Sequence, residues 1–167
     1  MFTTHTLETV PAASREAVRA IVGNLGHLPE AAARLAESPE LLTGFLHLSR
    51  VFERCTLEPV AREVVVMAVA VHNDCHVCVE MHAGKLRALG AGDLVVALCE
   101  ERPIRDERLE AVRQFSLDVL ASAGAVDDEG LKRFLSHGYN ERNALEVVLG
   151  IGAYTMSTFA NRLTRAA

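Results

Sequence analysis

The sequence has few aromatic residues, no tryptophan and no run of one charge sign. Aromatic residues make up 5% of its 167 positions. Lysine and arginine number 17 against 22 aspartates and glutamates, which gives a formal net charge of -5. The basic residues are not gathered into a stripe that could follow a phosphate backbone. We therefore expect no nucleic-acid partner.

The chain also lacks a long hydrophobic run. No stretch reaches the roughly 20 apolar residues that a membrane-spanning helix requires. Its first residues, MFTTHTLETVPAAS, do not show a basic segment followed by an apolar one. We expect a cytoplasmic protein without a membrane partner.

Cysteine is scarce, with four in the chain. Four are too few for a disulfide scaffold, and in a reducing compartment a close pair indicates redox or metal chemistry instead. Only Cys75 and Cys78 are close enough in sequence to form such a pair.

The pattern of apolar residues predicts an all-α fold. Half of the residues are hydrophobic, enough for a chain of this length to bury a core, so we expect one domain over residues 1–167. Glycine and proline fall mostly between periodic segments, and AGDLVVALCEE is one short helical segment. Capping residues predict where three other helices begin: Ser14 before EAVRAIVG, Ser38 before PELLTGFLHLSRVFERC, and Asp127 before EGLKRFLSHG. A longer amphipathic helix is predicted from Asp106 to Ala123, and Asn140 opens a final helix through Leu163.

Two consecutive helices are predicted in the centre of the chain. Residues 57–72, LEPVAREVVVMAVAVH, form an apolar run whose length and lack of alternation favour a buried helix over a strand. After a break at Asn73 and Asp74, CHVCVEMHAGKLRALG predicts a second helix that Gly90 ends. We expect these two helices to pack as an antiparallel pair.

Four residues on this pair form a candidate catalytic group. At helical spacing Cys75, Cys78 and His82 lie on one face. Cys75 is expected in the first turn, where the helix dipole lowers the pKa of a thiol. Glu63 lies on an apolar stripe of the preceding helix, where a carboxylate is costly unless it has a polar partner. If the two helices fold back as an antiparallel pair, Glu63 lies opposite His82. The spacing predicts a proton relay from Glu63 through His82 to Cys78.

A faint internal repeat accompanies this group. Two segments begin with the same tripeptide, Glu63-Val-Val and Glu146-Val-Val. When their glutamates are aligned, Thr158 of the second segment corresponds to Cys75 of the first, and Asn161 corresponds to Cys78. The match suggests a degenerate helix pair whose second copy has no thiols. Tyr154 and Phe159 in that segment are expected in the core or at a subunit interface.

The pattern E-x11-C-x-x-C-x-x-x-H resembles the signature of the AhpD-like alkylhydroperoxidases within the carboxymuconolactone decarboxylase superfamily. The resemblance implies an all-helical subunit that assembles into trimers or hexamers and reduces small hydroperoxides without a cofactor or metal. It implies that Cys78 attacks the peroxide and Cys75 resolves the sulfenic acid into a disulfide. An external dithiol, carried by a lipoyl or thioredoxin-like protein, would then reduce the disulfide.

One departure from the family pattern falls between the two cysteines. The family has a histidine directly before the second cysteine, whereas this chain has Val77 there and His76 one position earlier. Position 76 points about 100 degrees away from position 75 around a helix, so we do not expect His76 to replace the missing group.

Two rivals of the thiol peroxidase stay open at the level of sequence. A lactone decarboxylase-like lyase would use His82 and Glu63 for acid-base chemistry, but it would have no use for paired thiols. A non-catalytic metal-binding or assembly module would need a fourth zinc ligand beside Cys75, Cys78 and His82. The candidates for that ligand are His72, Asp74 and His76.

Overall fold

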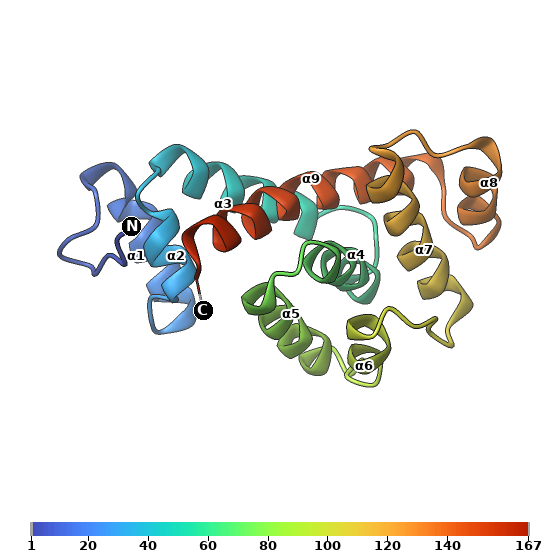
Figure 1. Cartoon of the computed structure of the whole chain (residues 1–167), viewed down its shortest axis with the longest axis horizontal. Helices are drawn as coiled ribbons and strands as arrows, with labels where there is room; N and C mark the ends of the chain where they lie inside the picture. The colour runs from blue at the N-terminus through green and yellow to red at the C-terminus, as the bar shows by residue number, and fades with distance from the viewer. Residues whose placement is uncertain (1, 167) are drawn as a thin grey trace.

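The computed structural model describes residues 2–166, and the chain is helical there without strands, as the sequence predicts (Figure 1). None of the helices in this range is both long and apolar enough to cross a membrane. The elements in chain order are η1 Ala12–Ser14, α1 Arg15–Leu25, α2 Glu30–Leu35, α3 Pro39–Glu53, α4 Pro59–His72, α5 His76–Ala88, α6 Leu94–Cys99, α7 Glu107–Ser122, α8 Asp128–Ser136 and α9 Glu141–Thr164.

Two of the three predicted capping residues, Ser38 and Asp127, begin helices through their side chains, and so do Asp106 and Asn140, where helices are also predicted to begin. Ser38, Asp106 and Asp127 accept backbone N–H groups from the first turns of α3, α7 and α8. Asn140 and Asn143 form a reciprocal capping box at the start of α9. These bonds satisfy backbone donors that have no partner inside the helix, which is why the local sequence is enough to locate them.

The predicted cap at Ser14 is wrong, although α1 begins directly after it. The Ser14 hydroxyl donates to the carbonyl of Ala36 at 2.7 Å and does not accept from the first turn of α1. Ala36 follows α2, a six-residue helix that the periodicity does not predict. A helix this short contributes too little periodic signal to be distinguished from a loop.

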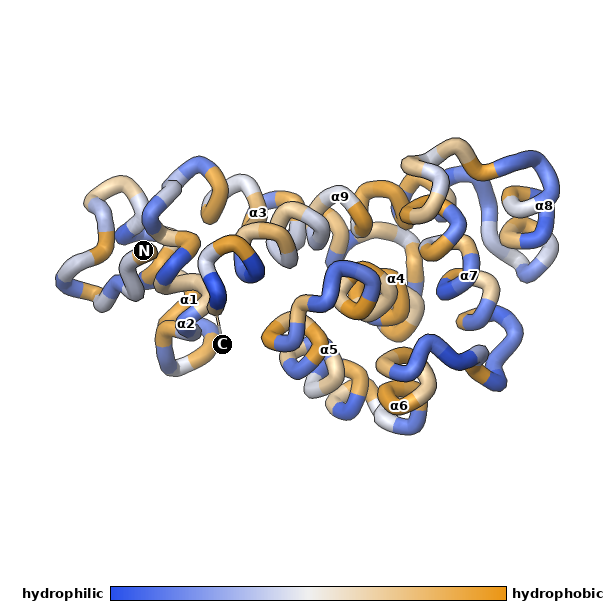
Figure 2. The backbone as a smooth tube through the Cα atoms, viewed as in Figure 1, coloured by the Kyte–Doolittle hydropathy of each residue, from blue (hydrophilic) through white to orange (hydrophobic). Residues whose placement is uncertain are grey.

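Helix α4 occupies the centre of the molecule, where Figure 1 shows it end-on between α9, α7, α5 and α6. Four consecutive residues, Val64 to Met67, are at most 1% exposed. Neighbours on several sides explain why this helix is apolar around its circumference and does not alternate between faces. Figure 2 shows the contrast between hydrophobic α4 and the hydrophilic loop that joins α6 to α7.

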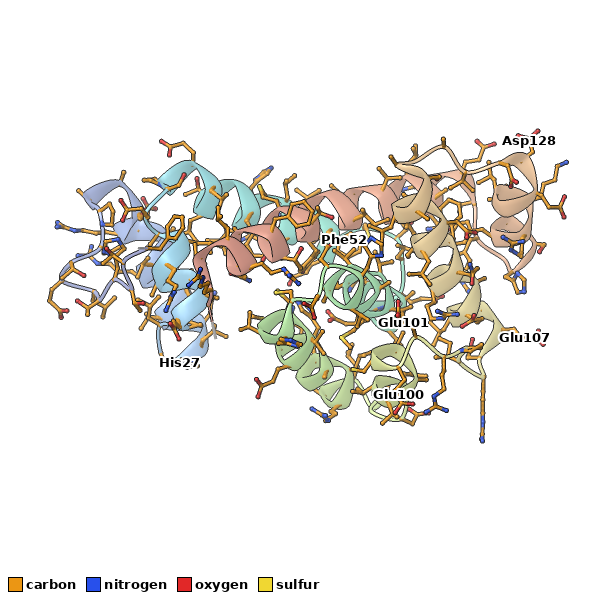
Figure 3. The ribbon with its side chains drawn as sticks, viewed as in Figure 1. His27, Phe52, Glu100, Glu101, Glu107 and Asp128 are labelled. Carbon is orange, nitrogen blue, oxygen red and sulfur yellow. The ribbon has the colours of Figure 1, made fainter. Side chains whose placement is uncertain are left out.

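Phe52 lies at the junction of α3, α4 and α9 (Figure 3). It is 1% exposed, and a Cβ atom added to Gly150 of α9 would lie 2.6 Å from its ring. The absence of a side chain at Gly150 therefore lets α9 pack closely against α3 and α4. This packing directs the C-terminal half of α9 toward the start of α5, where the cysteines lie.

Candidate active site

Glu63 and His82 meet between α4 and α5, as the helix-pair hypothesis predicts. The Oε2 atom of Glu63 lies 2.6 Å from Nδ1 of His82. Their side chains are 12% and 4% exposed, respectively. An ionised carboxylate can only accept, so Nδ1 is the donor and Nε2 is the nitrogen available to take a proton.

Tyr154 of α9 packs against the imidazole ring of His82. Its ring lies 5.2 Å from that of His82, at an interplanar angle of 85°. The tyrosine hydroxyl lies 3.2 Å from the hydroxyl of Ser49, and burial raises the pKa of Tyr154 to about 12. A neutral, buried tyrosine therefore supports the histidine by edge-to-face packing.

The two thiols lie in an apolar pocket at the start of α5. Cys75 and Cys78 are free thiols, 2% and 3% exposed, and they pack with Ala70. Cys75 is the N-cap of the helix and does not lie in its first turn, because α5 begins at His76. The expected position is therefore wrong by one residue, but the sulfur still lies at the positive end of the helix dipole.

Interaction between the two thiols separates their pKa values. The pKa of Cys75 is lowered to about 6, first by the hydrogen bond from Cys78 and then by the Cys78 backbone N–H, Asn161 and Arg162, against the opposing effect of burial. The pKa of Cys78 is raised, first because its thiol donates to Cys75 and then because it is buried. The interaction therefore favours the thiolate form of Cys75 and the thiol form of Cys78.

His82 lies one helical turn beyond Cys78 on the same side of α5. Both side chains are buried, as expected for two residues four positions apart on one helical face. Within residues 2–166 no hydrogen bond joins the imidazole directly to Cys78. The last step of the predicted relay therefore stays a prediction.

Asn161 of α9 is a polar neighbour of the thiols that the motif does not include. Its Nδ2 atom donates to Sγ of Cys78 at 3.3 Å, and the residue is 3% exposed. Its Oδ1 atom is buried and has no hydrogen-bond partner in the described part of the chain. The faint repeat, which aligns Asn161 with Cys78, is the sequence signal that points to this position.

Arg162 holds the turn that precedes the cysteines. Its Nη1 atom donates to the carbonyls of Asn73 and Asp74, both at 2.7 Å, and to the Asp74 carboxylate at 2.6 Å. Asp74 has a φ of 51°, a left-handed conformation that is unfavourable for a residue other than glycine. The arginine stabilises this turn, and its hydrogen bond, with its charge, lowers the pKa of Asp74.

The repeat hypothesis is wrong in one respect, because its second copy is not a helix pair. Helix α9 continues without a break from Glu146 past Asn161. Glu146 also has a different role from Glu63, since it accepts from the backbone N–H groups of Thr56 and Leu57 and the amide of Asn143. It joins the start of α9 to the loop before α4.

His76 points away from the site, as its helical position predicts. Its side chain is 92% exposed, and its closest charged neighbour is Asp74, at 3.6 Å. Val77 packs beside the thiols as a partly buried apolar residue. The imidazole that this chain offers to the cysteines therefore comes from His82.

The all-helical fold, with a cysteine pair at a helix start and a buried glutamate–histidine pair between the same two helices, can be compared with known proteins. Residues 36–99, which contain α3 to α6 and all four predicted site residues, match the carboxymuconolactone decarboxylase family. The match covers this part of the chain, and the whole fold is similar to that of solved structures described as AhpD-like. No curated protein matches it significantly in sequence.

Several solved structures share the fold. An uncharacterised peroxidase-related protein from Ralstonia eutropha, described as an alkylhydroperoxidase AhpD core, is 19% identical with a TM-score of 0.85, over 99% of this chain and 90% of that one. A peroxidase-related protein from a Silicibacter species is 20% identical with a TM-score of 0.80, over 95% and 85%. A cysteine-to-alanine variant of the debrominase Bmp8, in complex with 2,3,4-tribromopyrrole, is 18% identical with a TM-score of 0.80, over 100% and 90%.

Proposed function

We propose that this protein is a thiol-dependent oxidoreductase that reduces small alkyl hydroperoxides. The observation that carries the proposal is the buried cysteine pair with one lowered pKa, placed beside a histidine that a carboxylate orients. A thiolate is the reactive form of cysteine, and a neighbouring base is needed to manage its protons.

In the first step a thiolate attacks the terminal oxygen of the hydroperoxide. The new S–O bond forms as the O–O bond breaks, and the alkoxide leaves with a proton that an acid must supply. Sulfur is oxidised to a sulfenic acid and the peroxide is reduced to an alcohol. His82, oriented by Glu63, is the group that we assign to this proton transfer.

In the second step the other cysteine attacks the sulfenic sulfur. A disulfide forms and the hydroxyl leaves as water, so two thiols and one hydroperoxide give one disulfide, one alcohol and one water. An external dithiol on a lipoyl or thioredoxin-like protein then returns the pair to the thiol state. The cycle consumes no metal or organic cofactor.

We assign the attack to Cys78 and the resolving role to Cys75. The pKa of Cys75 is lowered and that of Cys78 is raised, each chiefly through its interaction with the other thiol. Attack by Cys78 therefore requires its proton to pass to a base, and we assign this transfer to His82, which then returns the proton to the leaving alkoxide. Asn161 and His82 flank Cys78, so this sulfur has the polar groups that the reaction needs.

Trapping the sulfenic acid tests both the chemistry and the assignment. Cys75→Ser should reduce one equivalent of cumene hydroperoxide and give a dimedone adduct at Cys78 by mass spectrometry, whereas Cys78→Ser should give none. The parent protein should form a Cys75–Cys78 disulfide and turn over with dihydrolipoamide. If both single variants turned over as fast as the parent, the proposal would be wrong.

A second candidate activity is the reductive debromination of an aromatic heterocycle. The structural similarity to a debrominase over the whole chain motivates it. Here too the two thiols would become a disulfide, while a C–Br bond is replaced by C–H with release of bromide and a proton. Bromide release from tribromopyrrole, compared with consumption of cumene hydroperoxide by the same sample, would distinguish the two activities.

A metal-binding module and a lactone decarboxylase-like lyase both have less support from the site. Within residues 2–166, no three His, Cys, Asp or Glu side chains are grouped so that they could hold a metal ion. A lyase that uses Glu63 and His82 alone would leave the thiol pair without a role.

We also propose that the protein forms homo-oligomers through α9. Its outer face carries a straight apolar stripe, in which the first and last residues are five helical turns, or about 27 Å, apart. The stripe has no covering element within the described chain and suits the same stripe on a second copy. Its four large side chains are 71%, 47%, 58% and 70% exposed, respectively: Leu145, Val148, Phe159 and Leu163.

A further inference from the structure

Within residues 2–166, the amide of Asn161 is the one side-chain group from α9 that donates to a cysteine of the pair. It lies 83 residues from Cys78 in sequence, yet its Nδ2 atom is 3.3 Å from Sγ. Burial of both residues excludes bulk water from this contact. An N–H directed at sulfur stabilises a negative charge there more than it stabilises the neutral thiol.

The other end of the same amide is unusual. The Oδ1 atom of Asn161 is buried and has no hydrogen-bond partner among the residues that the structure describes. A buried acceptor without a partner is destabilising, and such groups are rare in native proteins. Because Oδ1 and Nδ2 belong to one planar group, the unpaired oxygen is held by the same amide whose N–H bonds Sγ of Cys78.

Asn161 is fixed in this position by its neighbours on α9. Thr158, one turn earlier, accepts from the side chain of Asn73, and Arg162 donates to the carbonyls of Asn73 and Asp74. Both contacts tie α9 to the turn that leads into Cys75. The amide therefore keeps its position relative to the thiols without a hydrogen bond of its own to that turn.

We propose that Asn161 is a further catalytic residue, in which Nδ2 stabilises the thiolate form of the pair and Oδ1 accepts the O–H of the Cys78 sulfenic acid. The inference deepens the proposed thiol chemistry and rests on it. During attack the sulfur gains an oxygen that carries a proton, and this O–H is the donor that the unpaired Oδ1 lacks in the resting site. The direction of the pKa shift agrees, since the Asn161 amide favours the charged form of both cysteines.

The proposal is tested first without any peroxide. The rate of iodoacetamide alkylation is measured from pH 4.5 to 9.5 for the parent and for Asn161→Leu, which has similar volume and no donor. We expect the midpoint to rise by about one pH unit in Asn161→Leu, since one hydrogen bond to a charged sulfur is lost. Asn161→Asp, which adds a negative charge beside the pair, should raise it further.

Asn143→Leu is the matched control, because Asn143 is a buried asparagine on the same helix that bonds Thr56 and Glu146. This variant should be less stable to urea but should keep the parent midpoint. A midpoint in Asn161→Leu that equals the parent value would overturn the proposal, even if stability fell. That result would assign Asn161 a packing role only.

The Oδ1 role is tested in the Cys75→Ser background, where the sulfenic acid at Cys78 cannot form the disulfide. Adding Asn161→Leu should shorten the lifetime of that sulfenic acid, measured by delayed addition of dimedone after one equivalent of cumene hydroperoxide. An unchanged lifetime would remove this part of the proposal. If the alkylation midpoint shifted but no sample consumed peroxide, the thiolate role would stand and the peroxidase function would fail.

Discussion

Glu63 and Glu146 occupy corresponding positions in two sequence segments. We expect substitution by glutamine to reduce activity at Glu63 and to reduce stability at Glu146. Glu63→Gln keeps an oxygen that can accept from Nδ1 of His82, so its effect on stability should be about 1 kcal/mol or less. It removes the negative charge that stabilises a protonated imidazole. The rate of peroxide reduction should therefore fall about 100-fold, within the range of a general acid-base contribution.

Glu146→Gln should instead reduce stability. Both carboxylate oxygens of Glu146 accept, and the donors include two backbone N–H groups and the side chains of Asn143 and Arg142. Glutamine has an NH2 group in place of one carboxylate oxygen. This NH2 group cannot accept a hydrogen bond, so the donors that bond that oxygen lose their acceptor and lie against another donor. We expect a loss of about 3 kcal/mol, a large part of the 5–15 kcal/mol typical of a folded domain.

The pKa of Glu146 adds a test with a definite sign. Burial acts to raise this pKa, but hydrogen bonds from Thr56, Asn143 and Arg142 outweigh it and hold the value below 4.5. The ionised carboxylate therefore stabilises the folded chain above pH 4.5, and this contribution disappears as the pH falls through the lowered value. Glu146→Gln should lack this part of the acid sensitivity.

Both variants are compared by urea unfolding, followed by circular dichroism, and by single-turnover peroxide reduction per folded molecule. We expect Glu63→Gln to change the rate and Glu146→Gln to change the unfolding midpoint. A Glu63→Gln protein with the parent rate would refute the relay. A Glu146→Gln protein as slow as Glu63→Gln, at parent stability, would refute the division of roles between the two carboxylates.

Three further outcomes are expected. Gly150→Ala should destabilise the fold by about 1–3 kcal/mol, because its methyl group would overlap the ring of Phe52. Gly84→Ala is the control, since Gly84 is an exposed helical site with open space, and this change should stabilise the fold by about 0.5–1 kcal/mol. Urea unfolding measures both changes. The lowered pKa of Cys75 should stabilise the folded state above pH 9.0, and this contribution should be lost as the pH falls to about 6. The urea midpoint under reducing conditions should therefore rise as the pH is raised from about 6 to 9.0. A midpoint that stays constant over this range would contradict the pKa shift. Phe159→Glu should shift the protein toward monomer in sedimentation velocity, and an unchanged size would exclude the α9 stripe as the interface.

Much of the fold could be predicted because the signals are local. Ser38, Asp106, Asp127 and Asn140 each cap a helix within three residues, and the backbone donors that they satisfy lie in the same turn. The short α2 escaped prediction, and so did the role of Ser14, whose hydroxyl bonds a carbonyl 22 residues away. No local pattern encodes a contact of that range.

The sequence by itself determined the composition of the candidate catalytic group. Cys75, Cys78 and His82 lie within eight positions, so helical geometry alone places them on one face. The position of Glu63 opposite His82 could be predicted because a short turn pairs the two helices that carry them. Their types and spacing also resemble the AhpD-like signature, and the segment that carries them matches the carboxymuconolactone decarboxylase family.

Only the tertiary structure decided what surrounds this group. Asn161 and Tyr154 come from a helix that begins more than 60 residues after Cys78, and packing of α9 against α3 and α4 brings them to the thiols and to His82. Packing of α5 on α4 gives Glu63 a histidine partner, whereas packing of α9 gives Glu146 a set of backbone donors, although the two glutamates begin identical tripeptides. The physical reason is that hydrogen bonds and burial depend on neighbours in space, which a repeated local sequence does not specify.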